Sequence, residues 1–178
     1  MKMKDNKVKK LTMAALFTAL CCVATMIIKI PTPGTGGYVH LGDAFVVLAG
    51  IFLGPVYGAL AAGLGSALAD LLGGYFVYVP ITFVVKAVIA LVVALVYHKL
   101  TAKIKLPVVK CIICGIFSTV LVAFGYFAFE FFIYGIGAAA SIPANLIQGL
   151  SGLIISSILC PILSKINLGT YSNSVAQK

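Results

Sequence analysis

The sequence predicts an all-α, polytopic membrane protein with six transmembrane helices in a compact bundle and both termini in the cytoplasm. Composition is the first reason, because 62% of the 178 residues are hydrophobic and only 10% are charged, whereas charged residues make up about 25% of a soluble domain. The apolar residues fall into long runs separated by Pro and Gly, and most lysines lie outside those runs. A bilayer accommodates this much apolar surface, and we expect one domain over residues 1–178.

The first three spans are delimited by helix-breaking residues. A Pro-Thr-Pro-Gly-Thr-Gly-Gly segment follows the first apolar run and predicts an irregular loop over residues 31–41. Gly54-Pro55 separates the second run from the third, and Gly73-Gly74 ends the third. These boundaries predict spans over residues 11–30, 39–53 and 55–72.

Proline also opens the remaining three spans, because it is well tolerated in the first turn of a helix. Pro80 opens a span that reaches residue 97, and Pro107 opens one that ends near residue 134. Ser141 and Pro143 have the character of an N-cap and an early-turn residue, which predicts a last span over residues 141–163.

Lysine positions decide whether the short second run crosses the membrane. About 15 residues at ~1.5 Å per residue reach ~23 Å, less than the ~30 Å hydrocarbon core. With six crossings, however, the basic N-terminus (1–10), the lysine-rich segment 98–110 and the tail (165–178) all lie on one side. Because lysines favour the cytoplasmic side, we expect six spans, with the 31–41 loop outside.

Several function classes are disfavoured by the same sequence. The net charge of +9 comes from lysines that flank the spans, with no accompanying aromatic-basic surface for nucleic acid. Gly63-Leu64-Gly65 lies within a span and lacks the Lys-Ser/Thr of a phosphate loop. His40 and His98 fall on opposite sides of the membrane, so no shared metal is expected. The five cysteines lie in apolar runs and are expected to be helix-packing residues. We expect no enzyme and no cofactor.

Small residues mark faces where helices approach closely. Ala61, Gly65, Ala69 and Gly73 recur every four residues in the third span, which predicts packing inside the bundle. Ala15 and Ala19 form a similar pair, four residues apart, in the first span. This pair fits internal packing or an external contact equally well.

Ionisable groups inside a membrane are costly and therefore suggest function. Those within the predicted spans are Asp43, Asp70, Lys86 and Glu130, with Asn145 and Gln148 adding polar groups in the last span. In the predicted topology all six lie in the outer half of the bundle, and the inner half has no comparable cluster. The sequence therefore predicts one polar pocket near the external face.

Helical spacing groups these side chains into faces that suit a flat, polar heterocycle. Thr82 and Lys86 share one face, Glu130 lies between Tyr126 and Tyr134 on another, and the last span adds amides. Such faces combine aromatic walls with edge hydrogen bonds. The predicted substrate-binding residues are Lys86, Glu130, Asn145, Gln148, Thr82, Tyr134, Tyr78 and His40.

Structural roles remain open for some of these charges. Lys86 and Glu130 could neutralise one another as an ion pair. Asp70 could orient the adjacent Gly-Gly turn, and Asp43, which follows Gly42, is favoured as the N-cap of its helix. Lys29 is expected to reach the membrane interface as an anchor. His40 is either a ligand contact or a solvated loop residue.

Four segments together resemble one protein family. They are Leu-Gly-Asp-Ala at 41–44, Leu-Gly-Pro-Val-Tyr-Gly at 53–58, Ala-Asp-Leu-Leu-Gly-Gly-Tyr at 69–75 and Thr-Phe-Val-Val-Lys at 82–86. With six spans and a basic N-terminus, the chain resembles, over nearly its whole length, the substrate-binding S component of an energy-coupling-factor (ECF) vitamin transporter, of the riboflavin, hydroxymethylpyrimidine or pyridoxine group.

The resemblance implies six helices that bind a vitamin near the external face under a lid, here the 31–41 loop. It also implies docking on a transmembrane coupling protein served by two ATPase subunits, with Ala15 and Ala19 at the contact. The expected location is the bacterial cytoplasmic membrane. The favoured substrate is a vitamin B6 form or hydroxymethylpyrimidine, with riboflavin next.

A stand-alone secondary transporter, with Glu130 or Asp70 carrying a coupled proton, is the alternative. Against it, the sequence has no polar path through the inner half and no visible inverted repeat.

Overall fold

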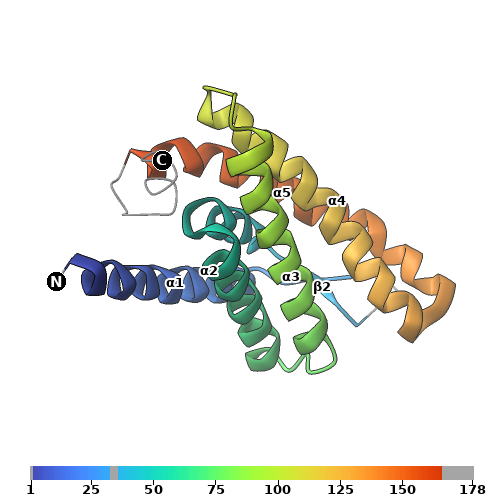
Figure 1. Ribbon diagram of the computed structural model, residues 1–178. Helices are drawn as coiled ribbons and strands as arrows, with labels where there is room; N and C mark the ends of the chain where they lie inside the picture. The colour runs from blue at the N-terminus through green and yellow to red at the C-terminus, as the bar shows by residue number, and fades with distance from the viewer. Residues whose placement is uncertain (1, 33–35, 166–178) are drawn as a thin grey trace.

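The computed structural model describes residues 2–32 and 36–165, and for residues 2–6 the backbone alone. Almost all of this part of the chain is helical, and a two-stranded antiparallel ribbon lies between the first two helices (Figure 1). The all-α class that the composition predicts is confirmed. The elements are α1 (Lys2–Ile27), β1 (Ile30–Pro31), β2 (Tyr38–Val39), α2 (Asp43–Leu72), α3 (Tyr78–Leu95), η1 (Val96–Leu100), α4 (Pro107–Tyr134), η2 (Gly135–Ser141) and α5 (Ile142–Ser164).

Helix α2 contains a break at the point where the sequence has Gly54-Pro55. Gly54 adopts φ 79° and ψ −174°, a conformation that side chains disfavour but glycine adopts readily. The following Pro55 has no N–H to donate to the preceding turn. The two parts of α2 therefore run in different directions, and the second and third predicted spans form a single element with a sharp kink.

The other helix boundaries lie close to the expected prolines. Helix α4 begins at Pro107, and α5 has Ser141 at its N-cap with Pro143 in the first turn. The Ser141 hydroxyl makes no capping hydrogen bond and is directed elsewhere, as described below.

Four stretches among the described residues are long and apolar enough to cross a membrane: Lys7–Ile27, Asp43–Leu72, Tyr78–Leu100 and Pro107–Ser164. The last stretch comprises α4, the short turn η2 and α5. Lengths and composition thus support a polytopic membrane protein.

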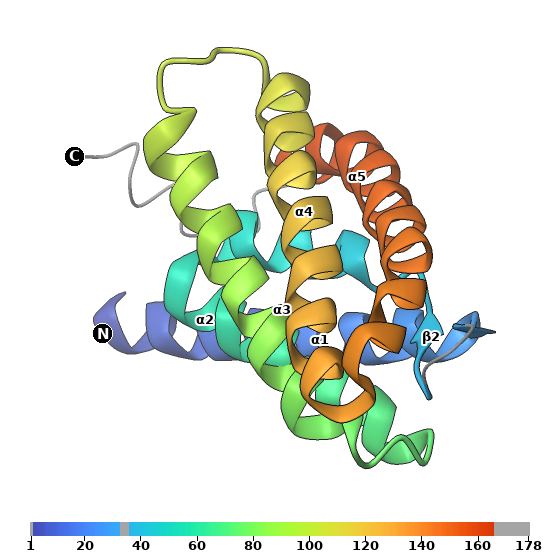
Figure 2. The same ribbon diagram turned by 90° about the vertical axis from the view of Figure 1, so that its right-hand side faces the viewer.

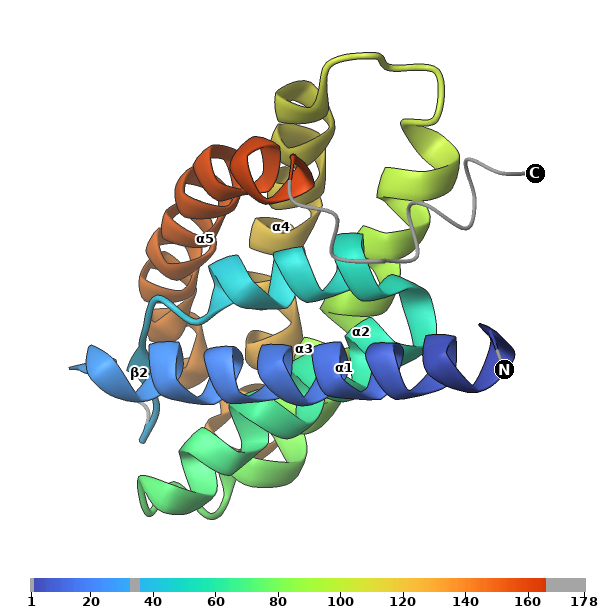
Figure 3. The same ribbon diagram turned by 90° about the vertical axis from the view of Figure 1, so that its left-hand side faces the viewer.

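The bundle is arranged around α2, which contacts α1, α3 and α5. Helix α4 lies between α3 and α5 (Figure 2). Helix α1 runs across the face formed by α2, with β2 near its C-terminal end (Figure 3). The N-terminal ends of α3 and α5 and the C-terminal end of α4 meet at the end of the bundle that carries the ribbon.

Glycines in α2 permit these close approaches. A Cβ on Gly65 would lie 2.3 Å from the carbonyl oxygen of Thr18 on α1. A Cβ on Gly50 would lie 2.5 Å from the carbonyl oxygen of Ala90 on α3. The internal packing predicted for the small residues of the third span is confirmed at Gly65, whereas Ala15 and Ala19 are exposed on α1.

The cysteines are more varied than expected. Cys21 and Cys114 are free and buried in the core, as predicted. The Sγ atoms of Cys111 on α4 and Cys160 on α5 lie next to each other in the core, a contact between helices that the sequence analysis did not predict. Spacing along one helix carries no information on a partner in another helix, 49 residues away.

Candidate functional site

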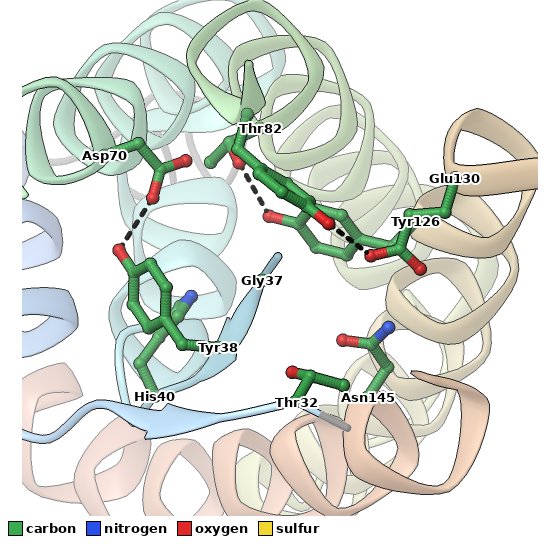
Figure 4. Close-up of a pocket in the computed structure, with 10 residues that line it drawn as sticks. Thr32, Gly37, Tyr38, His40, Asp70, Thr82, Tyr126, Glu130 and Asn145 are labelled. Carbon is green, nitrogen blue, oxygen red and sulfur yellow. Dashed lines mark hydrogen bonds between the residues drawn. The ribbon is translucent and has the colours of Figure 1, made fainter. Parts of the chain in front are cut away.

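A cavity lies under the ribbon, between the ends of four helices (Figure 4). Residues 28–32 and 36–42, which lie between α1 and α2 and include β1 and β2, cover it. These residues are called the lid below. Thr32, Gly37, Tyr38 and His40 of the lid, Asp70, Tyr78, Thr82, Tyr126, Glu130 and Asn145 line the cavity.

The lid is held in place by backbone pairing and by one side-chain contact to α2. Ile30 pairs with Val39 across the ribbon, and the Thr32 N–H donates to the Gly37 carbonyl at 3.0 Å. The Tyr38 hydroxyl donates to Asp70 Oδ1 at 2.6 Å. Burial, and then the neighbouring Asp70 carboxylate, raise the pKa of Tyr38, so this hydroxyl stays protonated as a donor.

Lys29, at the start of the lid, contacts two aromatic rings. Its Nζ lies 4.8 Å from the centroid of the Tyr38 ring and 5.2 Å from that of Tyr75. These distances fit cation–π contacts. Lys29 thus connects the start of the lid to Tyr38 and Tyr75, and its expected role as a membrane-interface anchor remains a prediction.

Two aromatic hydroxyls organise the wall formed by α3 and α4. Tyr126 and Thr82 hydroxyls are hydrogen-bonded at 3.0 Å, and the Tyr78 hydroxyl donates to Glu130 Oε1 at 2.9 Å. The Tyr78 and Tyr126 rings lie 6.5 Å apart, centroid to centroid. Ring faces and polar edges thus line the same space.

Glu130 connects α4 to the start of α5. Its Oε2 accepts a hydrogen bond from the Ser141 hydroxyl, which also donates to the Ala138 carbonyl. Asn145, one turn further along α5, reaches the Ser141 hydroxyl through Nδ2 at 3.4 Å. The carboxylate is 2% exposed, and both of its oxygens have protein partners.

A second polar network lies next to the cavity and is completely buried. Lys86 of α3 forms an ion pair with Asp43 Oδ1 at the start of α2, and Gln148 of α5 donates to Asp43 Oδ2 at 3.0 Å. Gln148 Oε1 accepts from the His40 backbone N–H at 3.1 Å. The network therefore joins α2, α3 and α5 to the end of the lid.

His40 is neutral in this arrangement. Its Nδ1 accepts the Gly42 N–H at 3.0 Å, which assigns the ring proton to Nε2. Burial, with Lys86 nearby, lowers the pKa of His40 to about 3. His40 contributes a dipole rather than a charge to the cavity, and it is buried rather than solvated.

The cavity is nearly filled by its own side chains. The free space is about 20 Å³, which is room for about one water molecule. A vitamin-sized ligand therefore requires the lid to open and the aromatic side chains to move. Pockets for small molecules typically offer ~300 Å³ or more.

The structure brings together five of the eight predicted substrate-binding residues at the cavity: His40, Tyr78, Thr82, Glu130 and Asn145. Lys86 and Gln148 belong to the adjacent buried network. Tyr134 is 39% exposed and lies beside Gly36 and Tyr78 at the outer edge of the lid. Their roles in binding remain predictions.

The structure excludes three structural roles that the sequence analysis considered. Lys86 pairs with Asp43 and not with Glu130. Asp43 is not an N-cap, because Gly42 holds that position without a side-chain hydrogen bond and the Asp43 carboxylate is turned inward to Lys86. Asp70 does not hold the Gly-Gly turn through its side chain, since its carboxylate meets Tyr38 while its carbonyl accepts the Tyr75 N–H.

Four further side chains line the cavity beyond those predicted to bind substrate. Asp70 and Tyr126 have a signal in the sequence, because both are polar residues within predicted spans. Tyr38 and Thr32 lie in an irregular loop, where no periodicity indicates which side chains point inward.

Comparisons with known proteins identify the family. The model for the S component of ECF-type riboflavin transporters matches residues 5–165. An uncharacterized protein from Pyrococcus woesei is 33% identical over 144 residues, which cover 80% of this chain and 93% of that protein. The thiamine precursor transporter HmpT from Lactococcus lactis subsp. cremoris is 27% identical over 168 residues, covering 93% and 94% of the two chains.

Solved structures share the fold. The crystal structure of the S component for biotin from an ECF-type ABC transporter superposes with a TM-score of 0.67 at 21% identity and covers 92% of this chain and 94% of that one. Another bacterial ECF transporter S component gives a TM-score of 0.65 at 23% identity, covering 89% and 97%. The matched family model spans nearly the whole chain, and this protein therefore belongs to the family of ECF-type riboflavin transporter S components.

Proposed function

We propose that this protein is the high-affinity binding subunit of an ATP-driven ECF importer and that it takes a small aromatic heterocyclic vitamin or precursor at the external face. The observation that carries the proposal is the buried polar cavity beneath the lid, lined by tyrosine rings, two carboxylates and an amide. A vitamin B6 form or hydroxymethylpyrimidine is favoured, and riboflavin comes next. The name of the Lactococcus lactis relative, a thiamine precursor transporter, supports the pyrimidine.

The proposed topology has six crossings, with α2 contributing two through its break at Gly54, and both termini in the cytoplasm of the cell membrane. The lid is then external. The lysine-rich segment between α3 and α4 lies on the same side as the N-terminus, as expected for cytoplasmic segments.

The coupling partners are a transmembrane protein and two ATPase subunits. Ala15 and Ala19 are exposed on α1 and four residues apart, so they present one small-residue face to which a partner helix can pack closely. We propose this face as the contact with the coupling protein. Replacing both alanines with leucine is expected to abolish co-purification with the partners while leaving vitamin binding intact.

The test of function is identification of the bound molecule. The chain is purified from cells in mild detergent, and co-purifying compounds are identified by mass spectrometry. We expect one vitamin or precursor in 1:1 ratio, and no uptake by the chain alone in liposomes. Uptake by the isolated chain driven by a pH gradient would instead establish a proton-coupled secondary transporter.

A further inference from the structure

The positive charge next to the cavity is already neutralised by the protein. Lys86 and Asp43 have no exposed side-chain surface, and they form an ion pair. His40 is neutral, with its Nδ1 occupied by the Gly42 N–H. Among the described residues that line the cavity, Asp70 and Glu130 carry carboxylates, and none is a lysine or an arginine.

The two carboxylates differ in what they can still accept. Glu130 receives Tyr78 on one oxygen and Ser141 on the other. Asp70 receives Tyr38 on Oδ1, whereas its buried Oδ2 makes no hydrogen bond of normal geometry within the described part of the chain. The Thr82 hydroxyl, which is hydrogen-bonded to Tyr126, is the neighbouring side-chain donor that acts on this carboxylate. Asp70 is 3% exposed. A buried oxygen without a well-formed hydrogen bond destabilises the empty site, and a ligand that brings a donor removes this cost.

The position of Asp70 connects ligand and lid. One carboxylate oxygen holds Tyr38 of the lid, and the other is available at the cavity (Figure 4). Thr82, on α3, lies on the same wall. A ligand donor bound at Oδ2 would therefore contact the same side chain, Asp70, that holds the lid closed through Tyr38.

We propose that Asp70 is the specificity-determining residue, that its Oδ2 accepts a hydrogen bond from an amino group on the heterocycle, and that the cavity takes uncharged or cationic ligands and rejects phosphate esters. The proposal rests on the proposed function and names its substrate class. Aminopyrimidines have the required donor. A phosphorylated vitamin would add its negative charge to a cavity that already holds two carboxylates, and none of the described residues that line the cavity is a cation. Like charges this close disfavour binding in a buried site.

Isothermal titration calorimetry on the purified full chain tests the ligand class. The probes are hydroxymethylpyrimidine, its phosphate ester, the analogue in which a ring carbonyl replaces the amino group, pyridoxine and riboflavin. We expect hydroxymethylpyrimidine to bind most tightly, and both the ester and the carbonyl analogue to bind at least about 100-fold more weakly.

The variant Asp70→Asn tests the residue. The amide keeps the size and one acceptor for Tyr38 but places an NH₂ group where Oδ2 stands, so it opposes the ligand's amino donor. We expect an affinity loss of about 30-fold or more for hydroxymethylpyrimidine and a smaller loss, or a gain, for the carbonyl analogue.

Tyr38→Phe is the matched control, because it removes the lid contact and leaves the Asp70 carboxylate in place. It is expected to weaken all ligands by a similar factor. Equal losses for every ligand in Asp70→Asn would overturn the proposal and reduce Asp70 to a lid contact. If Asp70→Asn does not fold, the ligand series on the unmodified chain still decides.

The outcomes separate the two proposals. Tight binding of riboflavin or of a phosphate ester in preference to hydroxymethylpyrimidine leaves vitamin binding standing and overturns the aminated-ligand inference. No binding of any probe by the folded chain, together with no co-purifying vitamin, overturns both.

Discussion

Lys86 and Asp43 form a fully buried ion pair that joins α3 to the first turn of α2. Gln148 completes the contact from α5, and through the His40 backbone it reaches the lid. Three helices thus meet at one carboxylate, and Gln148 connects it to the lid. The pair therefore has a structural function next to the cavity. The Asp43 carboxylate offsets the energetic cost of placing a lysine within a membrane helix.

Lys86→Met is expected to destabilise the fold. It leaves Asp43 as a buried charge with only Gln148 as a partner, which should lower the free energy of unfolding by about 3–5 kcal/mol. Titration with sodium dodecyl sulfate, followed by circular dichroism, measures the change. In the double variant Lys86→Met with Asp43→Asn no buried charge remains, so most of the loss should be recovered. A double variant as unstable as the single one would contradict a charge effect.

Asn145→Ala is expected to reduce binding more than stability. Asn145 lines the cavity, and its hydrogen bond to Ser141 is long at 3.4 Å. We expect an affinity for the co-purifying ligand about 10-fold lower, with the unfolding free energy changed by less than about 1 kcal/mol. Ser151→Ala is the control on the same helix, because that hydroxyl bonds to the Gln148 carbonyl. Unchanged affinity in Asn145→Ala would remove this residue from the binding site.

Tyr38→Phe is expected to act on the rate of ligand release. The Tyr38 hydroxyl gives the lid its 2.6 Å contact with α2, so its loss should make the lid open more often. We expect the dissociation rate to rise about 10-fold. The association rate should stay the same or rise, because entry also requires an open lid. Stopped-flow mixing with a competing ligand measures both rates, and an unchanged dissociation rate would contradict the role of the Tyr38 contact in holding the lid.

Helix ends and the polar cluster could be predicted from the sequence because both depend on local signals. Proline and glycine define where helices begin, as at Pro107, and a charge in an apolar run is conspicuous wherever it lies. Partners across helices could not be predicted. Periodicity places Lys86 on a face of α3 but carries no information on whether Asp43 or Glu130 lies opposite. Tyr38 was missed for the same reason, since the path of the lid depends on tertiary contacts.

Gly65→Val is expected to separate α1 from α2. A Cβ at this position would lie 2.3 Å from the Thr18 carbonyl oxygen and 2.7 Å from Cys21 Cβ, and neither group can move without shifting α1. We expect the free energy of unfolding to fall by about 2 kcal/mol or more, because the added side chain overpacks against backbone. Gly137→Ala is the control, because nothing lies within 4 Å of its Cβ position. A Gly65→Val protein as stable as the control would contradict the observed α1–α2 contact.

The buried histidine of the lid predicts how stability depends on pH. Burial lowers the pKa of His40 to about 3 from its ordinary value of 6.5, with Lys86 and Lys29 acting in the same direction and Asp43 against it. The folded state therefore keeps His40 neutral, while the unfolded chain binds a proton as the pH falls below 6.5. The contribution of His40 to the free energy of unfolding is complete above that pH and decreases between pH 6.5 and 3, by up to about 1.4 kcal/mol per pH unit.

Unfolding measured at several pH values in the unmodified chain and in His40→Gln isolates the contribution, since the carboxylates are common to both. We expect a shallower decrease in the variant. Identical slopes would mean that His40 is accessible to protons in the folded protein, and that the lid does not bury it in solution.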